Sequence, residues 1–279
     1  MRVSGFLGLF AGKPHHPVGP DGKMALSDHL RELRARVLKI AVVITVGLVV
    51  SLFFFDQIFA LVLEPYAAAQ AALGEDVRTE ATIAGAGGPL MLYLKLCGLV
   101  SVVLTSPFWL YQIWAFILPG LHDKERKWSR VFAAIAGPLF LAGVVLGYLT
   151  LPKGLEILIG LTPGDLTNLV EFGDYLTFLI RTLLVFGIAF EIPVFVILLN
   201  LAGVLPGAAL GAHRAWIVIG TFVFAAIATP STDPFTMLFL AVPMVVLFAI
   251  SEVIARFLDK RRAQADPAAG LADDELSPI

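Results

Sequence analysis

The chain has 279 residues, of which 58% are hydrophobic and 15% are charged, and its formal net charge at pH 7 is −2. In soluble proteins roughly a quarter of all residues are charged. A soluble domain of this size and composition could not cover so much apolar surface. The composition therefore predicts one polytopic membrane domain. The near-neutral charge offers no basic field for nucleic acid. The single cysteine, Cys97, excludes an internal disulfide framework and is expected to be a small core residue.

Residues 1–25 are rich in Gly, Pro and His, and we expect a flexible cytoplasmic lead there. The apolar run Phe6–Ala11 is too short for the core of a signal peptide. A helix is predicted to begin near Ser27, because Leu26, Leu30, Leu33 and Val37 recur at helical spacing beside charged residues. This amphipathic stretch is expected to lie on the cytoplasmic surface and to continue into the first membrane span.

Six apolar segments predict six transmembrane helices within a membrane domain over residues 26–258. Their approximate bounds are Ile40–Leu63, Leu92–Leu118, Val131–Leu151, Leu176–Leu201, Ala215–Ala228 and Phe235–Ile254. The fifth is short, at about 14 residues or about 21 Å of helix, against the roughly 30 Å of a bilayer core. The sixth segment is long enough to span, although it is grouped with the fifth as a short helix. Residues 230–234 between the two force a turn, so we expect them to form a tight hairpin. Residues 259–279 are predicted to be a disordered cytoplasmic tail.

The placement of cations predicts that both termini are cytoplasmic. Sixteen of the 20 Lys and Arg residues lie on the side of the termini, and four lie on or near the other side: Arg78, Lys95, Lys153 and Arg181. The two long loops on that other side, Glu64–Met91 and Pro152–Tyr175, are long enough to form a structured external cap.

Two features of the second and fourth spans are singled out. Trp109, Tyr111 and Trp114 are expected to form an interfacial aromatic belt where the second span meets the cytoplasm. Glu191 lies well inside the fourth span, two residues before Pro193, which is expected to kink the helix. A carboxylate within the membrane indicates a functional site, although a buried structural glutamate that faces a neighbouring helix is the other interpretation.

Three further carboxylates each allow two interpretations. Glu32 and Glu125 stand among cations, so they are either members of surface ion pairs, such as Glu32 with Arg36 at i,i+4, or docking points for cationic groups of a partner. A carboxylate accepts an arginine guanidinium with both oxygens, which favours specific docking. Asp233 lies between Thr232 and Pro234 and is expected to be an external turn residue.

Enzymatic motifs for nucleotide binding, zinc hydrolysis or a nucleophile elbow do not occur in the sequence, so we expect neither catalysis nor a cofactor or metal. The alternative function is a proton-coupled secondary transporter that uses Glu191. Such transporters commonly show inverted repeats and paired broken helices, and neither pattern is evident.

Several separated motifs, in one order, resemble the TatC subunit of the twin-arginine protein translocase over about Leu26–Phe257. They are His29–Arg36, Ser106–Pro107 with Tyr111–Phe116, Pro119–Leu121 with Glu125–Arg126, Phe190–Pro193, Thr229–Pro230 with Asp233, and Ala241–Met244. The resemblance implies a concave arrangement of six helices in a bacterial cytoplasmic membrane.

The resemblance also implies a non-enzymatic receptor for the paired arginines of signal peptides on folded cargo proteins. It would assemble with TatA/TatB-type single-span proteins, and with further copies of itself, and would use the proton-motive force. By motif position, Glu32 and Glu125 would receive the arginines, and Arg34, Arg36 and Phe116 would belong to the same site. Glu191 would be the polar element that meets partner helices or the signal-peptide hairpin.

The sequence departs from the family pattern at the start of the last span. Members often carry a Gln shortly after the external Asp, whereas this chain has Met237 there. Thr236 or Gln112 would then be the polar neighbour of Glu191.

Overall fold

The computed structural model describes residues 26–74, 79–83, 85–117, 123–163, 167–201, 203–229 and 234–265. The predicted lead (1–25) lies outside these ranges. The described elements are α2 (Leu26–Phe53), α3 (Phe55–Leu73), β1 (Thr79–Thr82), α4 (Gly88–Leu104), α5 (Ser106–Ile117), α6 (Asp123–Gly160), β2 (Asn168–Glu171), α7 (Phe172–Leu201), α8 (Gly207–Ala212), α9 (Arg214–Ala228) and α10 (Pro234–Ala265).

The helices of the described ranges include four that are long and apolar enough to cross a membrane: Ser27–Phe53, Ala134–Gly160, Phe172–Leu201 and Pro234–Gln264. The pair α4–α5 passes the same test as one span bent by 59°, which raises the number to at most five. The remaining apolar helix, α9, has 15 residues. The chain is therefore a multi-pass membrane protein, and the sixth span stays a prediction.

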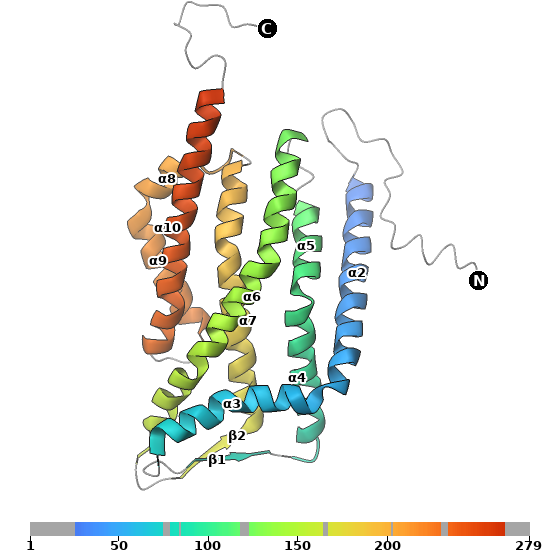
Figure 1. The fold of residues 1–279 in the computed structure, drawn as a ribbon, viewed down its shortest axis with the longest axis vertical. Helices are drawn as coiled ribbons and strands as arrows, with labels where there is room; N and C mark the ends of the chain where they lie inside the picture. The colour runs from blue at the N-terminus through green and yellow to red at the C-terminus, as the bar shows by residue number, and fades with distance from the viewer. Residues whose placement is uncertain are drawn as a thin grey trace, which may run out of the picture.

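The upright helices run between two ends of the molecule (Figure 1). α2 begins and α10 ends at one end, which we call the termini end; β1 and β2 lie at the opposite end, which we call the sheet end. The bend between α4 and α5 falls at Thr105, just before Ser106 and Pro107. Pro107 has no N–H to continue the helical hydrogen bonding, so a helix starts readily there but does not run straight through.

The first predicted span, Ile40–Leu63, is wrong at its second half. α2 stops at Phe53, and the chain turns at Phe54 into α3, which lies across the ends of the upright helices (Figure 1). The apolar residues of this part, such as Ile58 and Val62, are buried against the other helices of the chain and do not extend a span. Apolar composition alone cannot separate a lipid-facing helix from one that covers a core.

The two long loops form a structured cap, as expected, and this cap contains strands that the all-α prediction lacked; its external side stays a prediction. β1 and β2 pair in parallel, with Thr79 opposite Asn168 and Thr82 opposite Glu171. α3 is joined to this small sheet, since the Tyr66 and Thr79 hydroxyls lie 3.0 Å apart and Gln70 Nε2 donates to the Thr79 carbonyl. The fold is thus a helical bundle closed at one end by α3 and a two-stranded sheet.

The last two helices differ in length. α9 matches the short fifth span, but α10 has 32 residues, so the predicted short sixth span is wrong. α10 also continues to Ala265 and includes residues 259–265, which the prediction assigned to a disordered tail. Polar contacts hold this end: Asp259 accepts from Asn200 Nδ2 (2.8 Å), and Arg262 Nη1 donates to the Asn200 carbonyl (2.8 Å).

The core centres on α6 and α7, which approach closely through glycine. A Cβ atom at Gly187 would lie 2.6 Å from the Phe140 ring, and one at Gly143 would lie 2.5 Å from the carbonyl oxygen of Phe186. Both phenylalanines are almost completely buried, and Cys97 is buried as predicted. Close packing of these two helices fixes the level of Glu191 on α7 relative to its neighbours.

Candidate functional site

The termini ends of α2 and α5 are joined by polar and aromatic contacts. Arg36 donates through Nε to Glu32 Oε1 (2.9 Å), with Nη2 on the same oxygen, and through Nη1 to Gln112 Oε1 (3.2 Å). His29 stacks on Phe116, with ring centroids 4.4 Å apart. We call these five residues the α2–α5 cluster. The predicted i,i+4 pair of Glu32 with Arg36 is confirmed.

Glu32 is partly shielded, with 16% of its side chain exposed, yet its second oxygen, Oε2, accepts no hydrogen bond from any described residue. Arg36 is similarly shielded at 20%. Arg34, two residues away, is exposed. The cluster therefore presents a carboxylate that binds one guanidinium and keeps an oxygen available for another donor.

The side chains of two predicted site residues, Glu125 and Asp233, lie outside the part of the chain that the structure describes. Glu125 is the third residue of α6, but its side chain lies outside the described part of the structure. α5 and α6 pack along each other. Asp233 lies in the range 230–233, which the structure does not describe.

Glu191 receives a hydrogen bond from Trp114 Nε1 to its Oε2 (3.2 Å). The other oxygen, Oε1, is buried and has no partner among the described residues. Trp114 itself is 6% exposed, so its assignment to an interfacial aromatic belt is wrong. The indole instead connects α5 to α7 inside the bundle.

The expected substitutes for the missing family Gln do not contact Glu191. Gln112 accepts from Arg36 in the α2–α5 cluster. Thr236 lies beside Gly154 of α6, because a Cβ at Gly154 would be 3.4 Å from the Thr236 hydroxyl. Thr236 is in the first turn of α10, which begins toward the sheet end (Figure 1). α7 starts at the sheet end with Phe172, so Glu191 lies well toward the other end. The polar neighbour of Glu191 is therefore Trp114, and not Thr236 or Gln112 as predicted.

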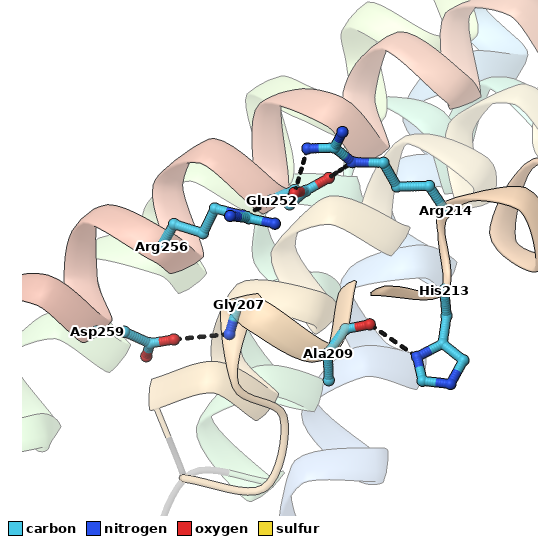
Figure 2. Close-up of polar contacts among 7 residues, drawn as sticks. All are labelled: Gly207, Ala209, His213, Arg214, Glu252, Arg256 and Asp259. Atoms are coloured by element: carbon cyan, nitrogen blue, oxygen red, sulfur yellow. Dashed lines mark hydrogen bonds and ion pairs between the residues drawn. The ribbon is translucent and has the colours of Figure 1, made fainter. Parts of the chain in front are cut away.

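A second polar group, formed by α8, α9 and α10, was missed by sequence reasoning (Figure 2). Glu252 of α10 is bound by Arg214 of α9 and by Arg256, four residues further along α10. One signal could have revealed it: Glu252 falls inside a predicted span, as Glu191 does, and an arginine follows at i,i+4. Within the described ranges, no group of three or more His, Cys, Asp or Glu residues could hold a metal ion.

Comparison with known proteins gives the family. Residues 28–243 match the family described as Sec-independent protein translocase protein (TatC). The chain is 40% identical over 268 residues to a Sec-independent protein translocase protein TatC of Frankia casuarinae, covering 93% of this chain and 74% of the relative. It is 36% identical over 239 residues to the TatC of Xylanimonas cellulosilytica, covering 86% of each.

A solved structure agrees with the sequence relatives. The crystal structure of the twin arginine translocase receptor TatC in DDM superposes with a TM-score of 0.67 at 30% identity, covering 81% of this chain and 99% of that one. The chain therefore belongs to the TatC family of Sec-independent protein translocase proteins.

Proposed function

We propose that this chain is the signal-peptide receptor and core subunit of a twin-arginine translocase in a bacterial cytoplasmic membrane. In this proposal it spans the membrane six times, with both termini in the cytoplasm. It binds the Arg-Arg motif of folded cargo proteins at the α2–α5 cluster and the start of α6. It then assembles with TatA/TatB-type single-span proteins, and with further copies of itself, for export driven by the proton-motive force. No enzymatic step is involved.

The observation that carries the proposal is the way Glu32 is held. Its carboxylate accepts two N–H groups of Arg36, which is the chemistry that an arginine of a signal peptide would require. In this proposal an incoming guanidinium binds Oε2 of Glu32, or it replaces Arg36 at the carboxylate. Arg36 already donates to Gln112 and would keep that hydrogen bond. The stacked rings of His29 and Phe116 belong to the same cluster, and guanidinium planes stack well on such rings.

A second carboxylate explains why two arginines would be needed. Glu125 stands at the start of α6, a helix that packs along α5 and so emerges near the cluster. We assign the second arginine to it. Lysine would keep both charges but would lose the planar fork of donors, so exchanging Arg-Arg for Lys-Lys separates carboxylate recognition from simple attraction.

Glu191 is assigned to contact with partner helices. A buried carboxylate oxygen without a partner has an unmet need for a donor, and a helix that docks beside α5 and α7 would supply one. The proton-coupled transporter is the less supported alternative, because the relatives are named as protein translocase proteins.

The test is export of a folded reporter in a translocase-deleted host that receives this protein and its cognate small partners. Reporters bearing Arg-Arg or Lys-Lys are compared in the parent, in Glu32→Ala and in Glu125→Ala. The matched control is Glu156→Ala, which removes a partly exposed carboxylate that pairs with Lys153 at i,i+3 near the sheet end.

We expect export of the Arg-Arg reporter, loss of most export with Lys-Lys, and a severalfold loss of Arg-Arg export in each site variant but not in the control. Export that ignores both site variants would remove the site assignment and leave the function. Absence of export by the parent, with all partners inserted, would contradict the function itself and direct attention to proton transport through Glu191.

A further inference from the structure

Two arginines converge on one carboxylate where α9 begins (Figure 2). Arg214 donates through Nε to Glu252 Oε2 and through Nη2 to Oε1, each at 2.7 Å, and Arg256 Nε donates to Oε1 at 2.7 Å. We call these three residues the Arg214–Glu252–Arg256 triad. Glu252 is largely buried, with 9% of its side chain exposed, so the triad is a fixed arrangement rather than a chance surface pair.

The triad carries one net positive charge, since two guanidinium groups face one carboxylate. Both cations stay accessible, with 66% of the Arg214 side chain and 51% of the Arg256 side chain exposed. The bonds to Glu252 use Nε and Nη2 of Arg214 but only Nε of Arg256. The remaining N–H groups have no partner in the described part of the chain, and they suit an anion with several oxygens.

Glycine in α8 makes room for the triad. A Cβ at Gly207 would lie 2.6 Å from the backbone nitrogen of Arg256, so α8 and α10 touch through their backbones. A Cβ at Gly211 would fall on the Arg256 guanidinium and would lie 2.8 Å from Glu252 Oε1. The position of the Arg256 side chain therefore depends on the missing side chain at 211.

An apolar groove begins at the triad and runs between α9 and α10. Its volume is about 390 Å³, and its walls include Ile217 and Val218 of α9 and Val245 and Phe248 of α10, with Arg214 and Glu252 at one end. The groove opens outward, because Val218 and Val253 are 37% and 68% exposed. An apolar, outward-facing surface on membrane helices faces acyl chains.

The charge around the groove also favours an anionic headgroup. In the described part of this corner, five cations (Arg214, Arg256, Lys260, Arg261 and Arg262) face two carboxylates (Glu252 and Asp259), an excess of three positive charges. α9 begins at Arg214, so the positive end of its dipole lies at the same place. Basic pockets between membrane helices on the cytoplasmic side are suited to anionic lipid headgroups.

We propose that the α9–α10 groove binds one anionic phospholipid of the cytoplasmic leaflet. Its phosphate binds the free N–H groups of Arg214 and Arg256, and one acyl chain lies along Ile217, Val245 and Phe248. Glu252 is a positioning residue that holds both guanidinium groups beside the groove. One phosphodiester charge neutralises the one net charge of the triad.

The test measures lipid binding to the full-length protein, purified in detergent and stripped of lipid, by native mass spectrometry. Phosphatidylglycerol is titrated against phosphatidylcholine with the same acyl chains, and inorganic phosphate is added as a competitor in a separate arm. Arg256→Gln removes one cation but leaves the paired contact of Arg214 with Glu252, so the buried carboxylate keeps a partner. Ala249→Phe fills the apolar part of the groove without touching a charge.

Two variants serve as matched controls. Arg261→Gln removes a cation that lies over Phe257 at the same end of α10. Ile250→Phe adds an aromatic ring at an exposed position next to Ala249 that does not line the groove.

We expect one phosphatidylglycerol to bind in preference to phosphatidylcholine, and its affinity to fall about five- to tenfold in Arg256→Gln and in Ala249→Phe. Gly211→Ala, which displaces the Arg256 guanidinium, should follow Arg256→Gln. Ile250→Phe should match the parent, and Arg261→Gln, which lowers the charge of this corner without removing a triad cation, should weaken binding far less than Arg256→Gln does. Equal binding of the two lipids, or unchanged binding in Arg256→Gln and Ala249→Phe, would overturn the proposal. Efficient competition by phosphate with no effect of Ala249→Phe would also overturn it, since the site would then bind anions without a lipid.

Discussion

Glu191 and Glu252 both lie inside apolar helices, but their surroundings give them different roles. Glu252 accepts three hydrogen bonds from two arginines, so its charge is compensated within the chain. Glu191 accepts one hydrogen bond from an uncharged indole, and its Oε1 is buried without a partner among the described residues. Burying a polar group without a partner costs free energy, so Glu191 is the carboxylate that a further donor would stabilise.

Replacing Trp114 by phenylalanine tests the hydrogen bond to Glu191. The phenyl ring keeps the aromatic contact with Phe195, at 6.3 Å between centroids, but it removes the Nε1–H donor. Leaving a buried polar group unpaired costs about 1–3 kcal/mol, so we expect the apparent Tm of the purified protein to fall by several degrees. The matched double variant Trp114→Phe/Glu191→Leu should recover most of this loss. If Trp114→Phe lowers the Tm equally in the parent and in a Glu191→Leu protein, the indole acts only by packing.

At the scale of the elements, the membrane helices are held together by small residues. Gly143 and Gly187 let α6 and α7 approach so closely that a methyl group at either position would overlap the neighbouring helix. α2 meets α4 in the same way. Ser101 Oγ donates to the Ile44 carbonyl (2.6 Å), and a Cβ at Gly47 would lie 2.7 Å from Ser101 Oγ. Lipid tails are as apolar as these side chains, so close packing and interhelical hydrogen bonds supply the attraction.

A glycine-to-alanine pair measures this packing. Gly143→Ala places a methyl group 2.5 Å from the Phe186 carbonyl oxygen, and a backbone atom can give way only if the whole helix shifts. Overpacking of this kind costs about 1–3 kcal/mol. Gly220→Ala in α9 is the control, because nothing lies within 4 Å of its added methyl group. Thermal unfolding in detergent should show a lower Tm for Gly143→Ala and an unchanged or slightly higher one for Gly220→Ala. Equal Tm values would mean that α6 and α7 are not in close contact.

At the scale of the whole molecule, the sequence predicts what depends on local pattern. The apolar segments locate α7 and α9 to within a few residues, and i,i+4 spacing predicts the Glu32–Arg36 pair. What depends on long-range contacts was missed. β1 and β2 are four residues each and gain their structure only by pairing with each other. The hydrogen bond from Trp114 to Glu191 likewise requires α5 and α7 to lie side by side, which no local pattern specifies.

The orientation of the molecule in the membrane rests on the distribution of Lys and Arg and can be tested at the two ends. Cys97 is buried, so an added cysteine is the only readily labelled one in the part of the chain that the structure describes. Ala81 of β1 is exposed at the sheet end, and Lys260 of α10 is exposed at the termini end. In intact cells, a membrane-impermeant maleimide should label Ala81→Cys but not Lys260→Cys, and permeabilised cells should label both. The unaltered chain controls for labelling of Cys97. The reverse pattern would place the termini outside, and with them the α2–α5 cluster, where a receptor for cytoplasmic cargo could not work.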